Sequence, residues 1–217
     1  AKVDCAEAFL KDQIPFALQA VVPATLKVAY DTAALLIKNE PILNVPSAQD
    51  NRGRIIQWAV DFGFERLCRS GQWPFDFRWR FFERPTGRYL EILPSHSVVT
   101  ISQVADPAKQ PRDVAFRANK RVNSQGWLRG LPNPNDEKPS GGALHILLVH
   151  GHQELNFAHL GIPKEEQQSG YYYRSPNLML MPHIVASSEA PPEDTDIEAV
   201  ITLKQEIDKW RRDNAVE

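Results

Sequence analysis

The chain has few cysteines, and their spacing excludes two common ways of stabilising a fold. Only Cys5 and Cys68 occur among the 217 residues, and neither belongs to a Cys-x-x-Cys pair. A disulfide scaffold and a zinc site built from thiolates are therefore not expected. The scarcity of cysteine favours a reducing compartment, and we expect a cytoplasmic protein.

Further absences exclude other functional classes. No uninterrupted apolar run approaches the ~18 residues of a membrane span, so no membrane partner is expected. The string GxSxG does not occur, which excludes the nucleophile elbow of the α/β-hydrolases. The net charge of −2 gives no overall attraction to nucleic acid, so any such affinity must come from local clusters of charge.

The composition is that of a folded protein. With 42% hydrophobic residues, the chain can bury a substantial core, and its length suits a single domain over 1–217. Residues 1–70 carry helical signals, in which Pro15 and Pro23 interrupt apolar runs and Pro41 ends the last. This pattern predicts two or three short helices, followed by a clearer helix over 49–70 with Ser47 as its N-cap.

The periodicity changes to two after residue 74, which predicts β-structure. Phe77, Trp79 and Phe81 alternate with Arg78 and Arg80, and a Pro-Thr-Gly turn leads into a second strand. Further short strand-like segments predict an antiparallel sheet or partial barrel over 75–185, and hence an α+β fold. A mobile loop is expected at 128–142, and an amphipathic C-terminal helix at 195–213 is expected to close the fold.

Positive charge is concentrated in the middle of the chain. Residues 76–130 contain ten Lys or Arg and five acids, although the whole chain is slightly acidic. Guanidinium groups beside aromatic rings can bind phosphates while the rings stack on bases, and Arg88 is expected to join Arg78 and Arg80 across the hairpin. The residues predicted to contact nucleic acid or an acidic protein are Arg78, Arg80, Arg84, Arg88, Arg112, Arg117, Lys120 and Arg121. The alternative is a solvated outer sheet face whose inner face carries the aromatic residues in the core.

Two groups of residues suggest a metal. His150 and His152 would share a strand face if the strand continued through Gly151, and two such imidazoles can hold a transition metal. The alternative is a pair of polar histidines at a strand end. Histidine is the commonest side-chain ligand of metal ions in proteins, so the two residues are candidate metal ligands.

Glu65, Asp76 and Glu91 occupy positions typical of a nuclease in which acids bind a divalent metal that activates water. The lysine that should follow two residues after the last acid is replaced by Leu93, and an ordinary structural role for the acids is the alternative. A metal-dependent, nuclease-like phosphodiesterase is therefore the rival interpretation, with a divalent metal as its cofactor.

The segment Tyr171–Arg174 suggests an interface, because tyrosine and arginine are enriched among residues that dominate binding energy. Tyr171 and Tyr173 would share one strand face, where they could equally belong to the core. Together with Arg174 they could mediate an adaptor function or a homo-oligomer. The leading hypothesis remains a non-enzymatic binding protein that uses the basic, aromatic hairpin, and the sequence does not identify its ligand, oligomeric state or biological process.

Overall fold

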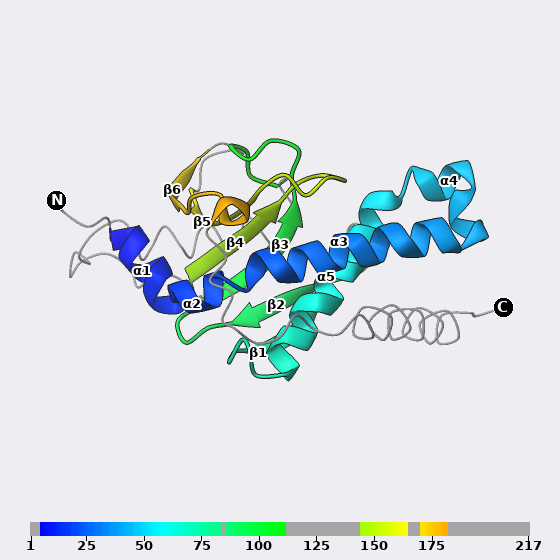
Figure 1. Cartoon of the computed structure of the whole chain (residues 1–217). Coiled ribbons are helices and arrows are strands. Elements are labelled where there is room, and N and C mark those ends of the chain that lie inside the picture. Colours follow the sequence, from blue (N-terminus) through cyan, green and yellow to red (C-terminus); the bar gives the residue numbers. More distant parts are fainter. Residues whose placement is uncertain (1–4, 84–85, 112–143, 165–169, 182–217) are drawn as a thin grey trace.

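The computed structural model describes residues 5–83, 86–111, 144–164 and 170–181 (Figure 1). Within them the chain forms helices and a six-stranded mixed sheet, so the α+β prediction is confirmed. The predicted loop at 128–142 and the predicted helix at 195–213 lie outside the described residues. The same holds for five predicted basic contact residues: Arg84, Arg112, Arg117, Lys120 and Arg121.

The helices precede the sheet in the chain. They are α1 (Cys5–Gln13), α2 (Phe16–Gln19), α3 (Val22–Asn39), the short 3-10 helix η1 (Pro41–Asn44), α4 (Pro46–Gln49) and α5 (Arg52–Arg69). Pro23 and Pro41 each stand in the first two positions of a helix, where the missing N–H costs nothing. Pro23 therefore stands at the start of α3, directly after the break that separates α3 from α2.

The predicted apolar stripe of α5 is confirmed, because Ile56, Val60, Phe64 and Leu67 are all buried. The predicted N-cap was wrong. Ser47 lies inside α4, and the residue before α5 is Asn51, whose side chain makes no capping hydrogen bond. Pro46 begins a separate helical turn there, so α5 begins at Arg52.

The strands lie in the sheet in the order of the sequence. They are β1 (Asp76–Glu83), β2 (Thr86–Leu93), β3 (Ser97–Gln103), β4 (Leu144–His150), β5 (Ala158–Pro163) and β6 (Tyr171–Arg174), followed by the 3-10 helix η2 (Leu178–Leu180). Neighbouring strands are antiparallel except β3 and β4, which are parallel. The prediction of a purely antiparallel sheet was therefore wrong at its centre. Central strands that are buried on both faces are typical of parallel pairing, and every residue of β4 is buried.

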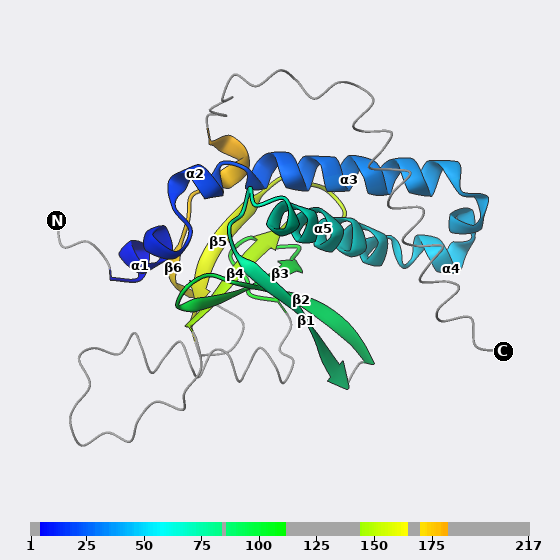
Figure 2. The ribbon, with the colours of Figure 1, turned by 90° about the horizontal axis from the view of Figure 1, so that it is seen from below.

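The helices cover one face of the sheet. The long helices α3 and α5 lie side by side across it, while the hairpin β1–β2 diverges from the other strands and extends along α5 (Figure 2). Alternate residues of the central strands point into this layer, where Val99, Ile146, Leu148 and Leu160 pack with Phe64 in the main core. The hairpin thus emerges from the core with one side turned toward α5.

The segment Phe16–Asn39 is long and apolar enough to span a membrane. A helix in the core of a protein outside the membrane can have the same length and composition, so this observation is weak evidence for a membrane span. The segment is apolar on average but is not an uninterrupted apolar run, because it contains charged residues such as Lys27 and Asp31. In the structure Leu26, Ala33 and Leu36 of this segment belong to the main core.

Candidate functional site

The register of the β1–β2 hairpin decides which of its side chains share a face. Directly opposite residues of an antiparallel pair project to the same side. Arg78 lies opposite Glu91 and Arg80 opposite Tyr89, whereas Arg88 lies opposite Phe81. Arg88 therefore does not join Arg78 and Arg80, and the expected three-arginine cluster is divided between the two faces.

One face, which we call the arginine–glutamate face, consists of Arg78, Arg80, Tyr89 and Glu91. The carboxylate of Glu91 is fully buried, and it accepts a hydrogen bond from Arg78 Nε at 2.7 Å and from the Tyr89 hydroxyl at 3.0 Å. Arg80 Nε lies 3.7 Å from the same carboxylate. The two arginines therefore neutralise a buried acid, which reduces the positive charge that this face offers to a ligand.

The other face, which we call the aromatic face, carries Trp79 and Phe81 from β1 and Arg88 from β2. The Trp79 side chain is 41% exposed and that of Phe81 is 61% exposed. Arg88 is also exposed, and within the described part of the chain no acid forms an ion pair with it. Large exposed rings are unusual on a folded surface, and here they stand beside the exposed guanidinium group of Arg88.

Helix α5 adds residues to the same side. Its Glu65 accepts a hydrogen bond from Trp79 Nε1 at 3.0 Å, and Arg69 stands over the Phe77 ring at 5.0 Å from its centroid. Positions 54, 58, 65 and 69 share one stripe of a helix, so Arg54 and Trp58 face the same way. The exposed residues of α5 are all arginine or tryptophan: Arg52, Arg54, Trp58, Arg66 and Arg69.

The three acids of the nuclease hypothesis are not brought together. Glu65 lies on the aromatic side and also binds Arg69 at 2.6 Å, whereas Glu91 is buried on the opposite face. Asp76 is exposed at the start of β1. Among the described residues, no group of three or more His, Cys, Asp or Glu side chains could hold a metal ion. Glu65, Asp76 and Glu91 therefore do not form the metal site that the nuclease interpretation assigned to them.

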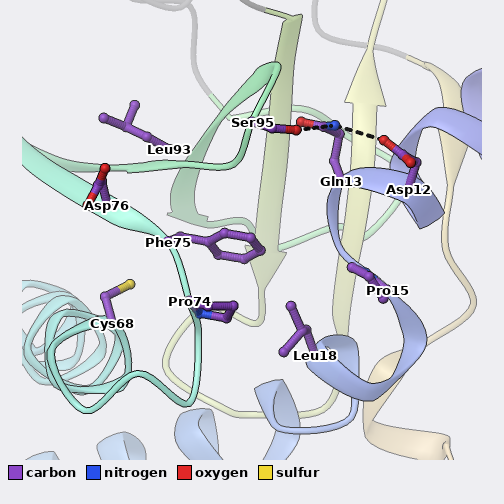
Figure 3. Close-up of a pocket in the computed structure, with 10 residues that line it drawn as sticks. All are labelled: Asp12, Gln13, Pro15, Leu18, Cys68, Pro74, Phe75, Asp76, Leu93 and Ser95. Atoms are coloured by element: carbon purple, nitrogen blue, oxygen red, sulfur yellow. Dashed lines mark hydrogen bonds between the residues drawn. The ribbon is translucent and has the colours of Figure 1, made fainter.

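Asp76 borders a separate pocket of about 630 Å³ between α1, α2, the end of α5 and the start of the hairpin (Figure 3). Gln13 forms one wall, where its amide donates hydrogen bonds to Asp12 and to Ser95 at 3.0 Å each (Figure 3). Cys68 also lines this pocket, but burial raises the pKa of its thiol to about 11, with a further contribution from Glu65. The thiol is therefore protonated at neutral pH and is a poor nucleophile.

The two predicted metal ligands differ in their surroundings. Strand β4 ends at His150, so the strand does not continue through Gly151 to His152. His150 is fully buried, and burial lowers the pKa of its imidazole to about 4, which keeps the ring neutral at physiological pH. His152 is exposed in the turn that follows.

The tyrosines of β6 separate, although alternation predicts a shared face. Tyr171 packs with Leu147, Val149 and Phe157 on the sheet face away from the helices, whereas Tyr173 packs against the main core. A register irregularity at Ile162 and Pro163 causes this divergence. Arg174 is exposed and donates a hydrogen bond to the Pro107 carbonyl.

Sequence reasoning missed the contribution of α5 to the aromatic face. The available signal was the composition of its polar positions, which are arginine-rich and include Trp58, but nothing local shows that the hairpin lies alongside them. No protein-family model, curated protein or solved structure matches this chain.

Proposed function

We propose that this protein is a non-enzymatic nucleic-acid-binding protein whose aromatic face and the adjoining side of α5 contact a single strand. The observation that carries the proposal is the exposure of Trp79 and Phe81 beside Arg88, which forms no ion pair with any described residue. Exposed rings stack on unpaired bases without regard to sequence, and each such contact contributes about 1–3 kcal/mol. A double helix presents no free base faces, so a single strand is the better fit.

Charge supports the same choice of ligand. Arg54 of α5 is exposed on the helix stripe that also carries Trp58, and Arg88 extends this positive charge onto the hairpin. Asp61 is buried, and Glu65 already binds Arg69. Arginine binds phosphate oxygens through its planar fork of donors, so the strand would run with its phosphates along α5 and its bases against the rings.

The test is a fluorescence anisotropy titration of the full chain against a labelled single-stranded oligonucleotide of mixed sequence, in DNA and RNA forms. Replacing Phe81 with Ala should weaken binding about tenfold or more, because one stacking contact is lost. Leu180→Ala is the matched control, since Leu180 on η2 is an apolar side chain that is even more exposed than Phe81, at 80%. It should bind as the unaltered protein does.

Two results would contradict the proposal. One is a folded protein that binds neither oligonucleotide at low salt. The other is a Phe81→Ala protein with undiminished affinity. Binding to polyglutamate but not to either oligonucleotide would instead identify an acidic protein as the partner.

A further inference from the structure

A second group of polar side chains lies where the parallel strands β3 and β4 end, under the start of α5. Gln103 and His150 are direct partners in the parallel register, so their side chains project side by side from the same face of the sheet. Gln103 reaches α5, where its Nε2 donates a hydrogen bond to the Gly53 carbonyl at 2.6 Å. His150 reaches α3, where Nδ1 lies 2.7 Å from the Tyr30 hydroxyl.

The hydrogen bonds around Tyr30 determine which nitrogen of His150 carries the proton. The Tyr30 hydroxyl donates its hydrogen to the Gly151 carbonyl. The same oxygen must then accept from His150, so Nδ1 is protonated and Nε2 presents a lone pair. Histidines that bind a metal through one ring nitrogen usually donate a hydrogen bond from the other. His150 has this arrangement, because Nδ1 donates to Tyr30 and Nε2 is left with its lone pair.

Two acceptor atoms in this group have no hydrogen-bond partner among the described residues. They are Nε2 of His150 and Oε1 of Gln103, and both atoms are buried. The amide orientation of Gln103 is determined, because its nitrogen is the atom that bonds to Gly53. Two buried lone pairs with no donor between them are costly, and an electron-pair acceptor such as a cation would satisfy both.

His152 is held close to the same place. A Cβ on Gly53 would lie 3.8 Å from Gln103 Oε1 and 3.8 Å from His152 Cε1, so the two side chains flank this residue. The turn that carries His152 tolerates only glycine at its start, because a Cβ on Gly151 would lie 1.9 Å from the Glu154 carbonyl oxygen. The turn therefore fixes where the His152 backbone sits, and its exposed ring can rotate toward the two buried atoms.

We propose that His150 Nε2, a ring nitrogen of His152 and Gln103 Oε1 bind one first-row transition-metal ion, with zinc as the leading candidate. Imidazole nitrogen suits zinc, nickel and copper, and water would complete the coordination. The positive end of α5 and Arg52 weakly oppose a cation, so we expect an affinity in the roughly micromolar range. This proposal does not depend on the proposed function.

The experiment is calorimetric titration of the chelator-treated full chain with zinc chloride, repeated with cobalt chloride while the visible absorption is recorded. One ion should bind per chain, and cobalt should develop the absorption bands of a nitrogen-ligated ion. His152→Ala should weaken binding at least tenfold. This substitution is preferred to a change at His150, because His152 is exposed and its removal should leave the fold intact.

His96→Ala is the matched control, since His96 is also exposed but lies in the turn before β3. It should bind zinc as the unaltered protein does. The proposal is overturned if the folded protein binds no zinc, which would mean that these acceptors serve a buried water. It is also overturned if His152→Ala binds as tightly as the unaltered chain, whatever other residue then proves responsible.

Discussion

The arginine–glutamate face and the aromatic face lie on opposite sides of the same two strands, yet their arginines have different environments. Arg78 and Arg80 surround the buried carboxylate of Glu91, whereas Arg88 stands exposed beside Phe81 with no acid paired to it in the described residues. The first pair is engaged within the fold, and the single arginine is available to a ligand. The number of arginines in a segment therefore overstates the positive charge that a ligand can reach. The strand register is needed to show which arginines are already paired with acids.

The largest expected effect tests the structural role of the arginine–glutamate face. Replacing Arg78 and Arg80 together with Ala should lower the free energy of unfolding by about 3–5 kcal/mol, because Glu91 would become a buried charge without a cation. Arg88→Ala should change it by less than about 0.5 kcal/mol. Urea denaturation followed by circular dichroism measures both. A double variant as stable as the Arg88 variant would show that the two faces do not differ in this way.

A second prediction compares two buried carboxyl groups. Asp61, on α5, is buried with a hydrogen bond from Gln57 Nε2 at 2.8 Å but no paired cation among the described residues. Burial raises its pKa from 3.8 to about 7, with a further rise from Glu65 and partial opposition from Gln57. The folded state thus holds a proton that the unfolded state releases, and stability falls as the pH rises from about 4 to 7.

Asp61→Asn removes the free-energy cost of ionising this buried carboxyl group. The variant should therefore be more stable than the unaltered protein by about 2–4 kcal/mol at pH 8, and the two should be equally stable near pH 4. Glu91→Gln is the matched change, and it should have the opposite sign because Arg78 and Arg80 lose their charged partner. Thermal and urea unfolding across this pH range measure both. A destabilised Asp61→Asn protein at pH 8 would be incompatible with the raised pKa.

Sequence patterns predicted the local elements well. The hairpin, the strand at Tyr171–Arg174 and the apolar stripe of α5 follow from periodicities of two and 3.6, which depend only on neighbouring residues. The division of Arg88 from Arg78 did not follow, because it depends on register across the turn, which alternation within one strand does not determine.

Long-range features were harder to predict for the same reason. The parallel pairing of β3 with β4 depends on a connection of some length, and continuous apolar runs occur in buried strands of either direction. The irregularity at Ile162 that separates Tyr171 from Tyr173 has no local signal in the sequence. The contacts of Gln103 with Gly53 and of Tyr30 with His150 join residues far apart in the chain, so only the folded structure shows that they meet.

The smallest expected effect separates the two faces by the salt dependence of binding. Log affinity for a single strand falls with log salt concentration by about 0.7 for each phosphate contacted. Arg88→Gln should therefore reduce the slope for the single-stranded oligonucleotide by about 0.7 and weaken binding a few-fold at low salt.

The control is Arg80→Gln, which removes the same charge from the same hairpin. The Arg80 guanidinium lies 3.7 Å from the Glu91 carboxylate, so this variant should leave the slope nearly unchanged. Anisotropy titrations at several salt concentrations measure both slopes. Equal slopes for the two variants would mean that binding depends on the net charge of the hairpin. The aromatic face would then not be the surface that contacts the phosphates.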